Sequence, residues 1–407
     1  MRILHIVKDW WLSEWAIAMF NSLPVENEYV FFNPSPGNKY EFKVLKSTQY
    51  VKIVDVDSLE YNTLLSDGKF DLLWAHGLYP ATATFVSKLN SDVKVMWSSY
   101  GFDYLLYGAQ WLYGPSTTLV WVKSTPISIV IKDLIRWFIY KLGMTHLVFG
   151  GLLNQLYFKF FDRVDYFSCV VPTEEKMIRK LIGKRAKKIL FNCISPDAKD
   201  PDCPVVDLNV KRMLVGNSAY MTNNHFDIFP VIAKSNWDVY SPLSYTMNGV
   251  GESKYSDKVV CLGRELMGAR FHPLLEFMPK DEYLKIMAKC SVFIFNIYRQ
   301  QALWNIRMAL TVGGCVFMCP NNPAYRYFTS HGIIIYPIKR LKSGIPEVIK
   351  EFKPYQLENI RKIKALRNCE RMIEEVRNSV GVLSEELDKG KQKWHLRNNS
   401  NPCHVQQ

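Results

Sequence analysis

The feature of this sequence that most constrains its fold is a series of short, continuous apolar runs separated by segments long enough for a helix. One series lies at residues 3–7, 29–32, 51–54, 72–74, 93–97, 166–171 and 189–191, and a second lies at 213–215, 237–240, 259–262, 292–295, 315–318 and 333–336. Strands buried on both faces of a parallel sheet are apolar throughout, whereas strands with one face in water alternate. The two series therefore predict an α/β protein with two doubly wound, Rossmann-like units.

The boundary between the two units is predicted by composition. The stretch 195-SPDAKDPDCPVVD-207 is rich in proline and aspartate, as linkers are. We expect a first domain over residues 1–200, a second over 208–350, and C-terminal helices over 351–407 whose polar tail frays after about residue 388. Ligands of such paired domains bind at the carboxyl ends of the strands, in the cleft between the domains.

Charge and cysteine content limit the binding partners and the cellular compartment that are expected for this protein. A formal net charge of +13 attracts anions such as phosphorylated small molecules, nucleic acid or an acidic membrane surface. Nine cysteines without C-x-x-C spacing argue against a disulfide framework and against a zinc site. No signal peptide and no long uncharged apolar run is seen, so we expect a cytoplasmic protein without a membrane-spanning helix. Four cysteines in apolar runs are expected to be reduced core residues: Cys261, Cys290, Cys315 and Cys319.

The region 104–161 combines many aromatic residues with scattered basic ones. A helix over the segment 127–143 would place basic residues on one face and bulky apolar residues on the other, as helices in a membrane interface do. The alternative is a helix that packs on the sheet. We predict that this region contacts an anionic membrane surface through Lys132, Arg136, Trp137 and Lys141.

The first candidate site is 212-RMLVGNSAYMTNNH-225, where a strand runs into a Gly-Asn-Ser turn and a helix opens near Asn223 or Asn224. Gly216 allows close backbone approach, and Asn217 and Ser218 can donate to phosphate oxygens beside free backbone N–H groups. The turn lacks the patterns of dehydrogenases and P-loop hydrolases, so both classes lose support. The alternative is a plain turn between two elements.

The second candidate site is 292-VFIFNIYRQQALWN-305, where a buried strand is followed by polar residues and a helix start. Arg299 could pair with a diphosphate in bidentate fashion, and Gln300 and Gln301 could hold a sugar or a base. The alternative role for Arg299 is to satisfy nearby carbonyl groups.

In the first domain, two strands end beside a glycine and a titratable side chain. His76 precedes Gly77, and Asp103 follows Gly101. Either side chain could act as a general base on an acceptor hydroxyl, although a lone histidine is more often structural. The chain has no convincing Asp-x-Asp motif for holding a metal and a nucleotide diphosphate, so phosphates are expected to be held by amide dipoles and cations, with no metal and no other cofactor.

The segments 214–225, 240–245 and 281–301, and more loosely 75–77 with 100–105, resemble the TDP-N-acetylfucosamine:lipid II N-acetylfucosaminyltransferase family of enterobacterial common antigen synthesis. The resemblance implies a GT-B glycosyltransferase that uses a TDP- or UDP-sugar and a polyprenyl-diphosphate-linked glycan. It further implies a peripheral protein on the cytoplasmic face of the bacterial inner membrane, in the synthesis of surface polysaccharide such as lipopolysaccharide O-antigen. The nucleotide-sugar contacts that it implies are Gly216, Asn217, Ser218, Asn223, His225, Ser244, Tyr245, Tyr283, Arg299, Gln300, Gln301 and Asn305.

The sequence departs from the family at two places. Ala302 and Trp304 follow Gln301 where the family tends to have small residues such as Gly-Ile-Gly, which affects the expected donor sugar. The early Gly-Ser turn is replaced by residues 8–11, Lys-Asp-Trp-Trp, which affects the acceptor contacts. Two alternatives remain: a GT-B enzyme with another sugar or acceptor, and a nucleic-acid-binding protein. Because no nucleic-acid-binding motif is present, we expect no nucleic-acid partner.

Overall fold

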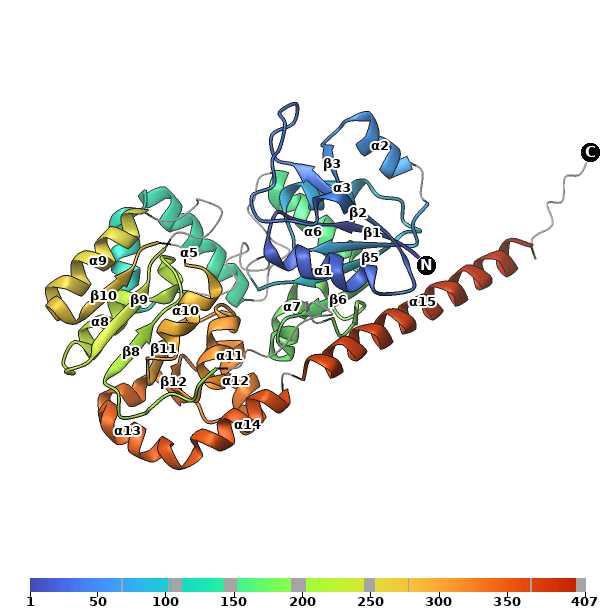
Figure 1. Ribbon diagram of the computed structural model, residues 1–407. Coiled ribbons are helices and arrows are strands. Elements are labelled where there is room, and N and C mark those ends of the chain that lie inside the picture. The colour runs from blue at the N-terminus through green and yellow to red at the C-terminus, as the bar shows by residue number, and fades with distance from the viewer. Residues whose placement is uncertain are drawn as a thin grey trace, which may run out of the picture.

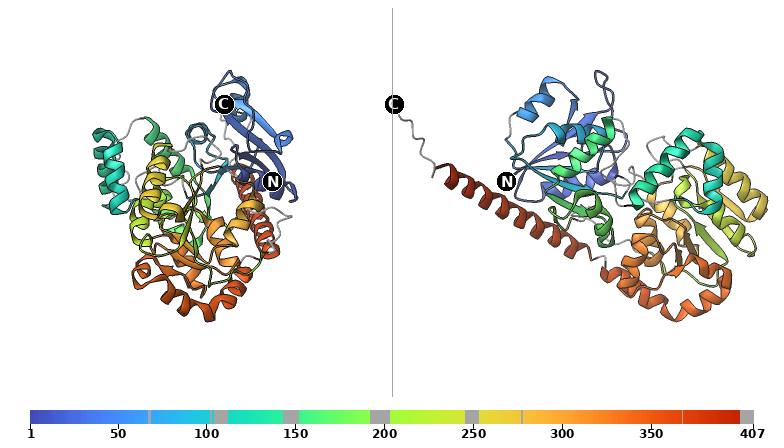
Figure 2. Two further views of the ribbon diagram at one scale, coloured as in Figure 1. Left: turned by 60° about the vertical axis from the view of Figure 1, so that its left-hand side comes forward. Right: turned by 180° about the vertical axis from the view of Figure 1, so that it is seen from behind.

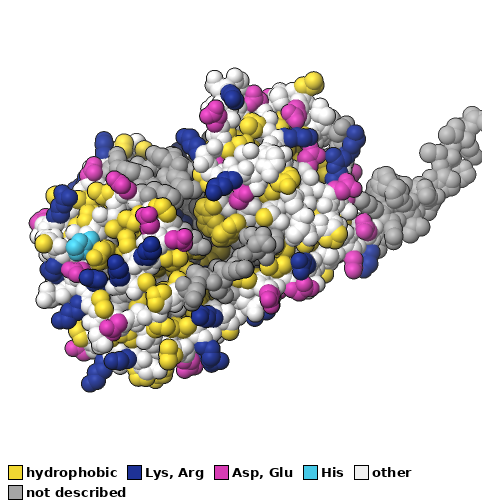
Figure 3. All heavy atoms as spheres, in the orientation of Figure 1, with side chains coloured by type: hydrophobic (Ala, Val, Ile, Leu, Met, Phe, Trp, Pro, Cys, Tyr) yellow, Lys and Arg dark blue, Asp and Glu magenta, His cyan; other side chains and the backbone are white. Residues whose placement is uncertain are grey.

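The computed structural model describes residues 1–66, 69–101, 103, 112–142, 152–191, 203–244, 253–276, 278–366 and 368–399. These residues form two units, each built around a parallel sheet that is flanked by helices (Figure 1). Two further views show the same division into two units (Figure 2). Seen as spheres, the two units meet at a hollow, and basic and acidic side chains are interspersed over both (Figure 3). The predicted fold class, two doubly wound α/β units, is confirmed.

The first sheet has the strand order β3-β2-β1-β4-β5-β6-β7, and every pair of neighbours is parallel. The chain order reverses between β1 and β4, which are direct neighbours. The strands are β1 (Arg2–Ile6), β2 (Glu26–Asn33), β3 (Val51–Asp55), β4 (Leu72–His76), β5 (Lys94–Ser99), β6 (Tyr166–Cys169) and β7 (Lys187–Lys188).

The second sheet has the strand order β10-β9-β8-β11-β12-β13 and is also parallel throughout. Here the chain order reverses between β8 and β11. The strands are β8 (Arg212–Val215), β9 (Asp238–Pro242), β10 (Phe271–Leu274), β11 (Val292–Phe295), β12 (Cys315–Met318) and β13 (Tyr336–Pro337).

Helices connect the strands and cover the sheets. They are α1 (Trp11–Asn21), α2 (Leu59–Ser66), α3 (Pro80–Lys88), α4 (Pro115–Ser124), α5 (Ile127–Lys141), α6 (Leu152–Arg163), α7 (Glu175–Ile182), α8 (His225–Ile232), α9 (Ser253–Met267), α10 (Lys280–Met287), α11 (Leu303–Thr311), α12 (Pro323–Ser330), α13 (Ile345–Phe352), α14 (Gln356–Leu366) and α15 (Cys369–Asn399). No helix among the described residues has both the length and the apolar character needed to cross a bilayer.

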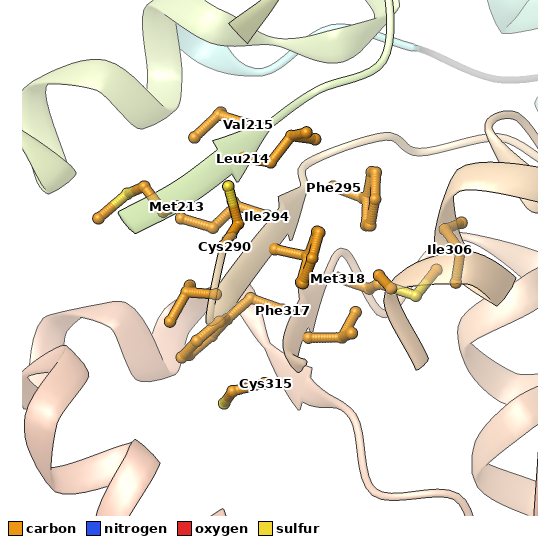
Figure 4. Packing of buried hydrophobic residues seen from close by; sticks show 14 of the residues in the cluster. Met213, Leu214, Val215, Cys290, Ile294, Phe295, Ile306, Cys315, Phe317 and Met318 are labelled. Atoms are coloured by element: carbon orange, nitrogen blue, oxygen red, sulfur yellow. The ribbon is translucent and has the colours of Figure 1, made fainter. Parts of the chain in front are cut away.

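The core of the second unit lies around its central strands (Figure 4). Leu214, Ile294 and Phe317 are fully buried on β8, β11 and β12. Complete burial of such a side chain stabilises a fold by about 1.5–3 kcal/mol. The central strands therefore form a rigid base for the loops at their carboxyl ends.

Two helical segments pack on one unit although they follow the strands of the other unit in the chain. Tyr113, Val120 and Trp121 pack against the core of the second unit, although the segment follows β5 of the first sheet. Conversely, α15 follows the second unit but packs on the first, where Val376 and Leu383 join the core beneath β1 and β4. The hydroxyl of Tyr166 on β6 donates to the Glu386 carboxylate at 3.1 Å. The two units are thus joined by exchanged helices.

The structure corrects several of the predicted elements. Residues 259–262 lie within α9, where Tyr255, Val259, Gly263 and Met267 are buried at the four-residue spacing of a helix. Strand β10 was not predicted. The short strand β7 ends just before the predicted run 189–191, and strand β13 begins only at the last residue of the predicted run 333–336. Helix α15 continues to Asn399, and the fraying expected after residue 388 stays a prediction.

The prediction for the cysteines is confirmed at three of the four positions. Cys290, Cys315 and Cys319 are buried and free. Cys261 is free but exposed, because it lies on the outer face of α9 rather than in a strand.

Candidate functional site

Both predicted motifs of the second unit lie where its strand order reverses. The first follows β8 and the second follows β11, and these strands are paired with Val215 opposite Ile294. The amide of Gly216 donates to the carbonyl of Ile294 at 2.9 Å, which extends the pairing beyond the end of β8. In open α/β sheets, ligands bind at the carboxyl ends of the strands at this point. The fold therefore brings the two motifs together at the expected ligand crevice.

The turn after β8 needs glycine at its first position. Gly216 has a φ of +76°, and a Cβ atom there would lie 2.7 Å from Nε2 of His225 and 3.1 Å from Oδ1 of Asn223. Both the left-handed backbone and the close approach of His225 exclude a larger residue. The turn is therefore held tightly against the start of α8.

The prediction that the backbone N–H groups of this turn are free is wrong for two of them. The Gly216 amide is bonded to β11, and the Asn217 amide donates to Oδ1 of Asn223 at 3.0 Å. Nδ2 of Asn223 donates in turn to the carbonyl and the hydroxyl of Ser218, at 3.1 Å each. Asn223 acts as a brace inside the loop, so these two amides are already used.

His225 opens helix α8, which confirms the predicted helix start. Its side chain is fully buried, and its Nδ1 lies 3.1 Å from the Tyr255 hydroxyl. Burial lowers the pKa of His225 to about 3, because a charged imidazolium would lose its hydration. His225 is thus a neutral side chain packed behind Gly216.

Gln301 links the two motifs. Its Nε2 donates to Oδ1 of Asn217 at 3.1 Å, and its Oε1 accepts from the Thr222 hydroxyl at 2.7 Å. The glutamine is therefore held at both ends of its amide by the loop after β8. This bridge sets the spacing between that loop and the start of α11.

Arg299 and Gln300 occupy the turn between β11 and α11. Arg299 is half-buried, and its Nη1 donates to the carbonyl of Gln300 at 3.1 Å. The side chain of Gln300 is buried against Gly101 of the first unit, at a distance that leaves no room for a Cβ at Gly101. Arg299 thus lies in the turn that leads into α11, and the N-terminus of a helix favours an anion through its N–H groups and its dipole.

The remaining predicted contacts of the second unit lie elsewhere. Nδ2 of Asn305 donates to the Tyr283 hydroxyl at 2.8 Å, so these two residues tie α11 to α10. Ser244 is half-buried just beyond β9, and Tyr245 lies outside the described residues. The structure gathers at the strand reversal the residues Gly216, Asn217, Ser218, Asn223, His225 and Gln301, with Arg299 and Gln300 beside them.

In the first unit, Asp103 is fully buried at the end of β5. Its Oδ2 accepts from the Trp97 indole at 3.0 Å, and its Oδ1 accepts from the Ser99 hydroxyl at 2.9 Å and from the Tyr100 amide at 3.2 Å. Burial raises the pKa of Asp103 to about 6, although these hydrogen bonds oppose the shift. The carboxylate therefore holds the turn after β5 and would titrate in the range that suits a general base.

His76 lies inside a hydrogen-bonded chain across the first sheet. Asn27 donates through Nδ2 to two backbone carbonyls, so its Oδ1 must accept from Nε2–H of His5 at 3.0 Å. Nδ1 of His5 then accepts from Nε2–H of His76 at 3.1 Å, and Nδ1 of His76 accepts from the Tyr100 hydroxyl at 3.3 Å. Both nitrogens of the buried His76 are used, which favours a structural role over the predicted catalytic one.

Lys8 and Tyr79 were missed from the sequence as a pair. Lys8 follows β1 and Tyr79 lies in the turn after β4, so they flank the strand reversal of the first sheet. Nζ of Lys8 lies 3.9 Å from the centroid of the Tyr79 ring, a cation–π distance, and burial lowers the pKa of Lys8. The position of Lys8 directly after the first strand was the signal that could have identified it.

The predicted membrane residues lie on α5. Lys132 is exposed and Trp137 is half-buried, whereas the side chains of Arg136 and Lys141 are outside those that the structure describes. Within the described part of the chain, no group of three His, Cys, Asp or Glu side chains is arranged to hold a metal ion.

Comparison with known proteins bears on the fold. No family model matches the chain, and no curated protein sequence matches it. Among solved structures, sucrose-phosphate synthase from Thermosynechococcus elongatus is similar with a TM-score of 0.62 and 11% identity, over 96% of this chain and 100% of that one. Anabaena HepE in complex with UDP gives a TM-score of 0.60 and 10% identity, over 95% and 100% of the two chains.

A third similar structure is α,α-trehalose 6-phosphate synthase from Burkholderia multivorans, with a TM-score of 0.53 and 10% identity over 99% of both chains. These likenesses extend over nearly the whole chain and include both sheets. The protein therefore has the GT-B fold, with two Rossmann-like domains.

Proposed function

We propose that this protein is a GT-B glycosyltransferase that moves a deoxyamino sugar, similar to N-acetylfucosamine, from a nucleoside diphosphate to a polyprenyl-diphosphate-linked saccharide. The observation that carries the proposal is the meeting of the two motifs at the strand reversal of the second sheet, through the bridge from Gln301 to Asn217. Anabaena HepE, which shares the fold, was solved with UDP and with UDP-glucose, which supports a nucleotide-sugar donor.

The donor diphosphate is assigned to the N-terminus of α11 beside Arg299. Because the amides of Gly216 and Asn217 are already bonded, that helix end and the guanidinium are better placed to receive the phosphate charge. Negative charge builds up on the diphosphate as the glycosidic bond to it breaks. Fixed donors aimed at that charge stabilise the transition state.

The acceptor is assigned to the strand reversal of the first sheet. Lys8 supplies a positive charge there, which suits an acceptor that carries a diphosphate. Asp103 stays the candidate base for the acceptor hydroxyl, although its carboxylate is buried and accepts three hydrogen bonds. Its raised pKa of about 6 suits the removal of a proton near neutral pH. We propose that the donor and acceptor bind without a metal ion, and that the protein works on the cytoplasmic face of the bacterial inner membrane in surface polysaccharide synthesis.

The alternative of a nucleic-acid-binding protein is not favoured. On the face shown in Figure 3, basic side chains are interspersed with acidic ones rather than gathered into one area. A phosphate backbone is bound by clustered basic side chains. A GT-B enzyme with a different sugar or acceptor remains the nearer alternative, and the following experiment distinguishes it.

The test is a thermal-shift screen of the purified protein with TDP-, UDP- and GDP-linked sugars, each with and without EDTA. We expect a TDP- or UDP-linked deoxyamino sugar to raise the melting temperature by several degrees, and EDTA to leave that shift unchanged. The best donor is then incubated with a polyprenyl-diphosphate-linked saccharide, and transfer is followed by mass spectrometry. A shift with a different sugar would support the nearer alternative, and no shift with any nucleotide sugar would overturn the proposal.

A further inference from the structure

Helix α5 exposes a continuous apolar surface. Five residues of the helix recur at helical spacing, and Leu142 continues the spacing directly after its end. We call these six residues the apolar strip: Ile127, Ile131, Leu134, Ile135, Phe138 and Leu142. At 100° per residue they fall within an arc of about 100° on the helix. Each side chain is between 44% and 68% exposed. Exposed apolar residues that stand singly are normal, whereas a contiguous group of them indicates an interaction surface.

The contact of α5 with the rest of the protein is narrow. Val130 is buried, and Asp133 and Trp137 are half-buried, whereas every other described side chain between Ile127 and Phe138 is exposed. The buried and half-buried residues are three and four positions apart, so they form one line along the helix. α5 therefore rests on the protein along that line and turns the apolar strip outward.

The preceding helix adds to this surface and fixes its position. On α4, Leu119 is 61% exposed and Val122 is 38% exposed, while Trp121 packs on the core of the second unit. In Figures 1 and 2, α4 and α5 (teal) lie on the outer edge of that unit. The two helices therefore form a projecting element.

The attachment of α4 to the second unit is specific. Asp227 on α8 accepts from the Ser116 amide at 2.8 Å and from the Thr117 hydroxyl at 2.6 Å, so its carboxylate caps the first turn of α4. Oδ1 of Asn224 accepts from the Gly114 amide at 2.8 Å, and a Cβ at Gly114 would lie 2.5 Å from the Asp227 carboxyl carbon. The strip is thus held on the unit that carries Arg299 and Gln301.

Charge decides which partner suits the strip. Between residues 115 and 142 the chain has four basic residues, Lys123, Lys132, Arg136 and Lys141, and one acidic residue, Asp133. An apolar face flanked by basic residues fits an anionic lipid surface, where the apolar side chains enter the acyl boundary and the basic ones meet the headgroups. Two copies of this chain meeting at the strip would instead bring like charges together, each on a protein of net charge +13.

We propose that the apolar strip of α5 inserts into an anionic bilayer. This insertion would hold the second unit directly against the membrane. Insertion of apolar side chains is not screened by salt, whereas the contribution of the basic residues is. The docking needs neither donor nor acceptor, so its failure would leave the proposed transferase activity untouched.

The test is co-sedimentation of the full chain with vesicles of phosphatidylethanolamine containing one quarter phosphatidylglycerol, without nucleotide sugar. The double substitution Ile131→Gln with Ile135→Gln removes apolar side chains from the strip. The matched control is Ile129→Gln, because Ile129 is 47% exposed on the same helix but points roughly 160° away from Ile131. All three proteins are also examined by thermal unfolding and by sedimentation equilibrium without vesicles.

We expect the strip variant to lose vesicle binding by at least about fivefold, with an unchanged melting temperature, while Ile129→Gln binds as the native chain does. Native binding should persist in part at high salt. Equal binding by the strip variant and the native chain, or no binding by the native chain, would overturn the proposal. So would a native dimer that the strip variant abolishes without any change in vesicle binding, because the strip would then be an interface between copies.

Discussion

The amide of Gln301 spans two loops, since its Nε2 donates to Oδ1 of Asn217 at 3.1 Å. The residues are 84 positions apart in the chain and meet because β8 and β11 are neighbours in the second sheet. The loop after β8 is therefore held at a set distance from the start of α11. Any ligand at the start of α11 would therefore lie beside the loop after β8, and Gln301 sets the position of that loop.

Substitution Gln301→Ala should weaken donor binding without unfolding the protein. It removes the bonds to Asn217 and Thr222, each contributing about 1 kcal/mol, so the dissociation constant for the donor should rise by up to about 30-fold. Calorimetric titration with the nucleotide sugar measures this. Thr222→Val, which removes only one of the bonds, should have a smaller effect, and an unchanged affinity in Gln301→Ala would show that the bridge does not support the site.

Substitution Arg299→Ala should reduce diphosphate affinity in particular. A charge-assisted hydrogen bond contributes about 1.5–3 kcal/mol, which corresponds to roughly 10- to 100-fold in the dissociation constant. The loss should appear with the nucleoside diphosphate alone as well as with the complete sugar donor. Arg299→Lys should recover part of it, because the charge returns without the bidentate geometry. Equal binding of the diphosphate by Arg299→Ala and the native protein would place the phosphates elsewhere.

Substitution Asp103→Asn should reduce turnover far more than donor affinity. An amide has nearly the same size as the carboxylate but cannot take a proton from the acceptor. For the native enzyme, kcat/KM should fall as the pH drops below about 6, since Asp103 becomes protonated near that value. If Asp103→Asn instead lowers the melting temperature and leaves the dependence of kcat/KM on pH unchanged, Asp103 only holds the turn through Trp97 and Ser99.

Substitution Lys8→Met should raise the KM for the acceptor and leave donor affinity unchanged. Methionine keeps the apolar contact with the Tyr79 ring but removes the charge that would meet an acceptor diphosphate. Initial rates with each substrate varied separately distinguish the two effects. The same rise in KM for the donor would show that Lys8 faces the nucleotide sugar instead.

Acid should destabilise the protein through its buried neutral histidines. Burial lowers the pKa of His5 and of His225 to about 3, and lowers that of His76, whereas in the unfolded chain they protonate near their usual value of 6.5. Above that value neither state binds the proton, so stability is unaffected. Below it only the unfolded state does, so each histidine lowers the free energy of unfolding by about 1.4 kcal/mol per pH unit.

Urea unfolding across the pH range below 6.5 measures this dependence. His225→Gln should reduce the slope by about 1.4 kcal/mol per pH unit, because one protonating group is lost from the unfolded state. The matched control is His331→Gln, which removes an exposed histidine without opening the core. An unchanged slope in His225→Gln would mean that this histidine takes up protons in the folded state.

Several elements were readable from local pattern alone. The runs at β8, β11 and β12 are apolar throughout because both faces of these strands are buried, and this property is visible in any short window. The run at 259–262 has the same local appearance, yet it belongs to α9. Only the wider spacing from Tyr255 to Met267 distinguishes it, and Gly263 leaves the space that the Phe271 ring of β10 fills.

By itself, the sequence determined the two parallel α/β units and the turns that follow their strands, because apolar runs and turn residues are recognisable from residues adjacent in the chain. It also determined the amphipathic character of α5. Only the tertiary structure decided that the Asn217 amide is taken by Asn223, that His76 is enclosed between His5 and Tyr100, and that α4 is capped by Asp227. These outcomes depend on contacts between distant segments, and a hydrogen-bonding group has no assigned partner until the chain has folded.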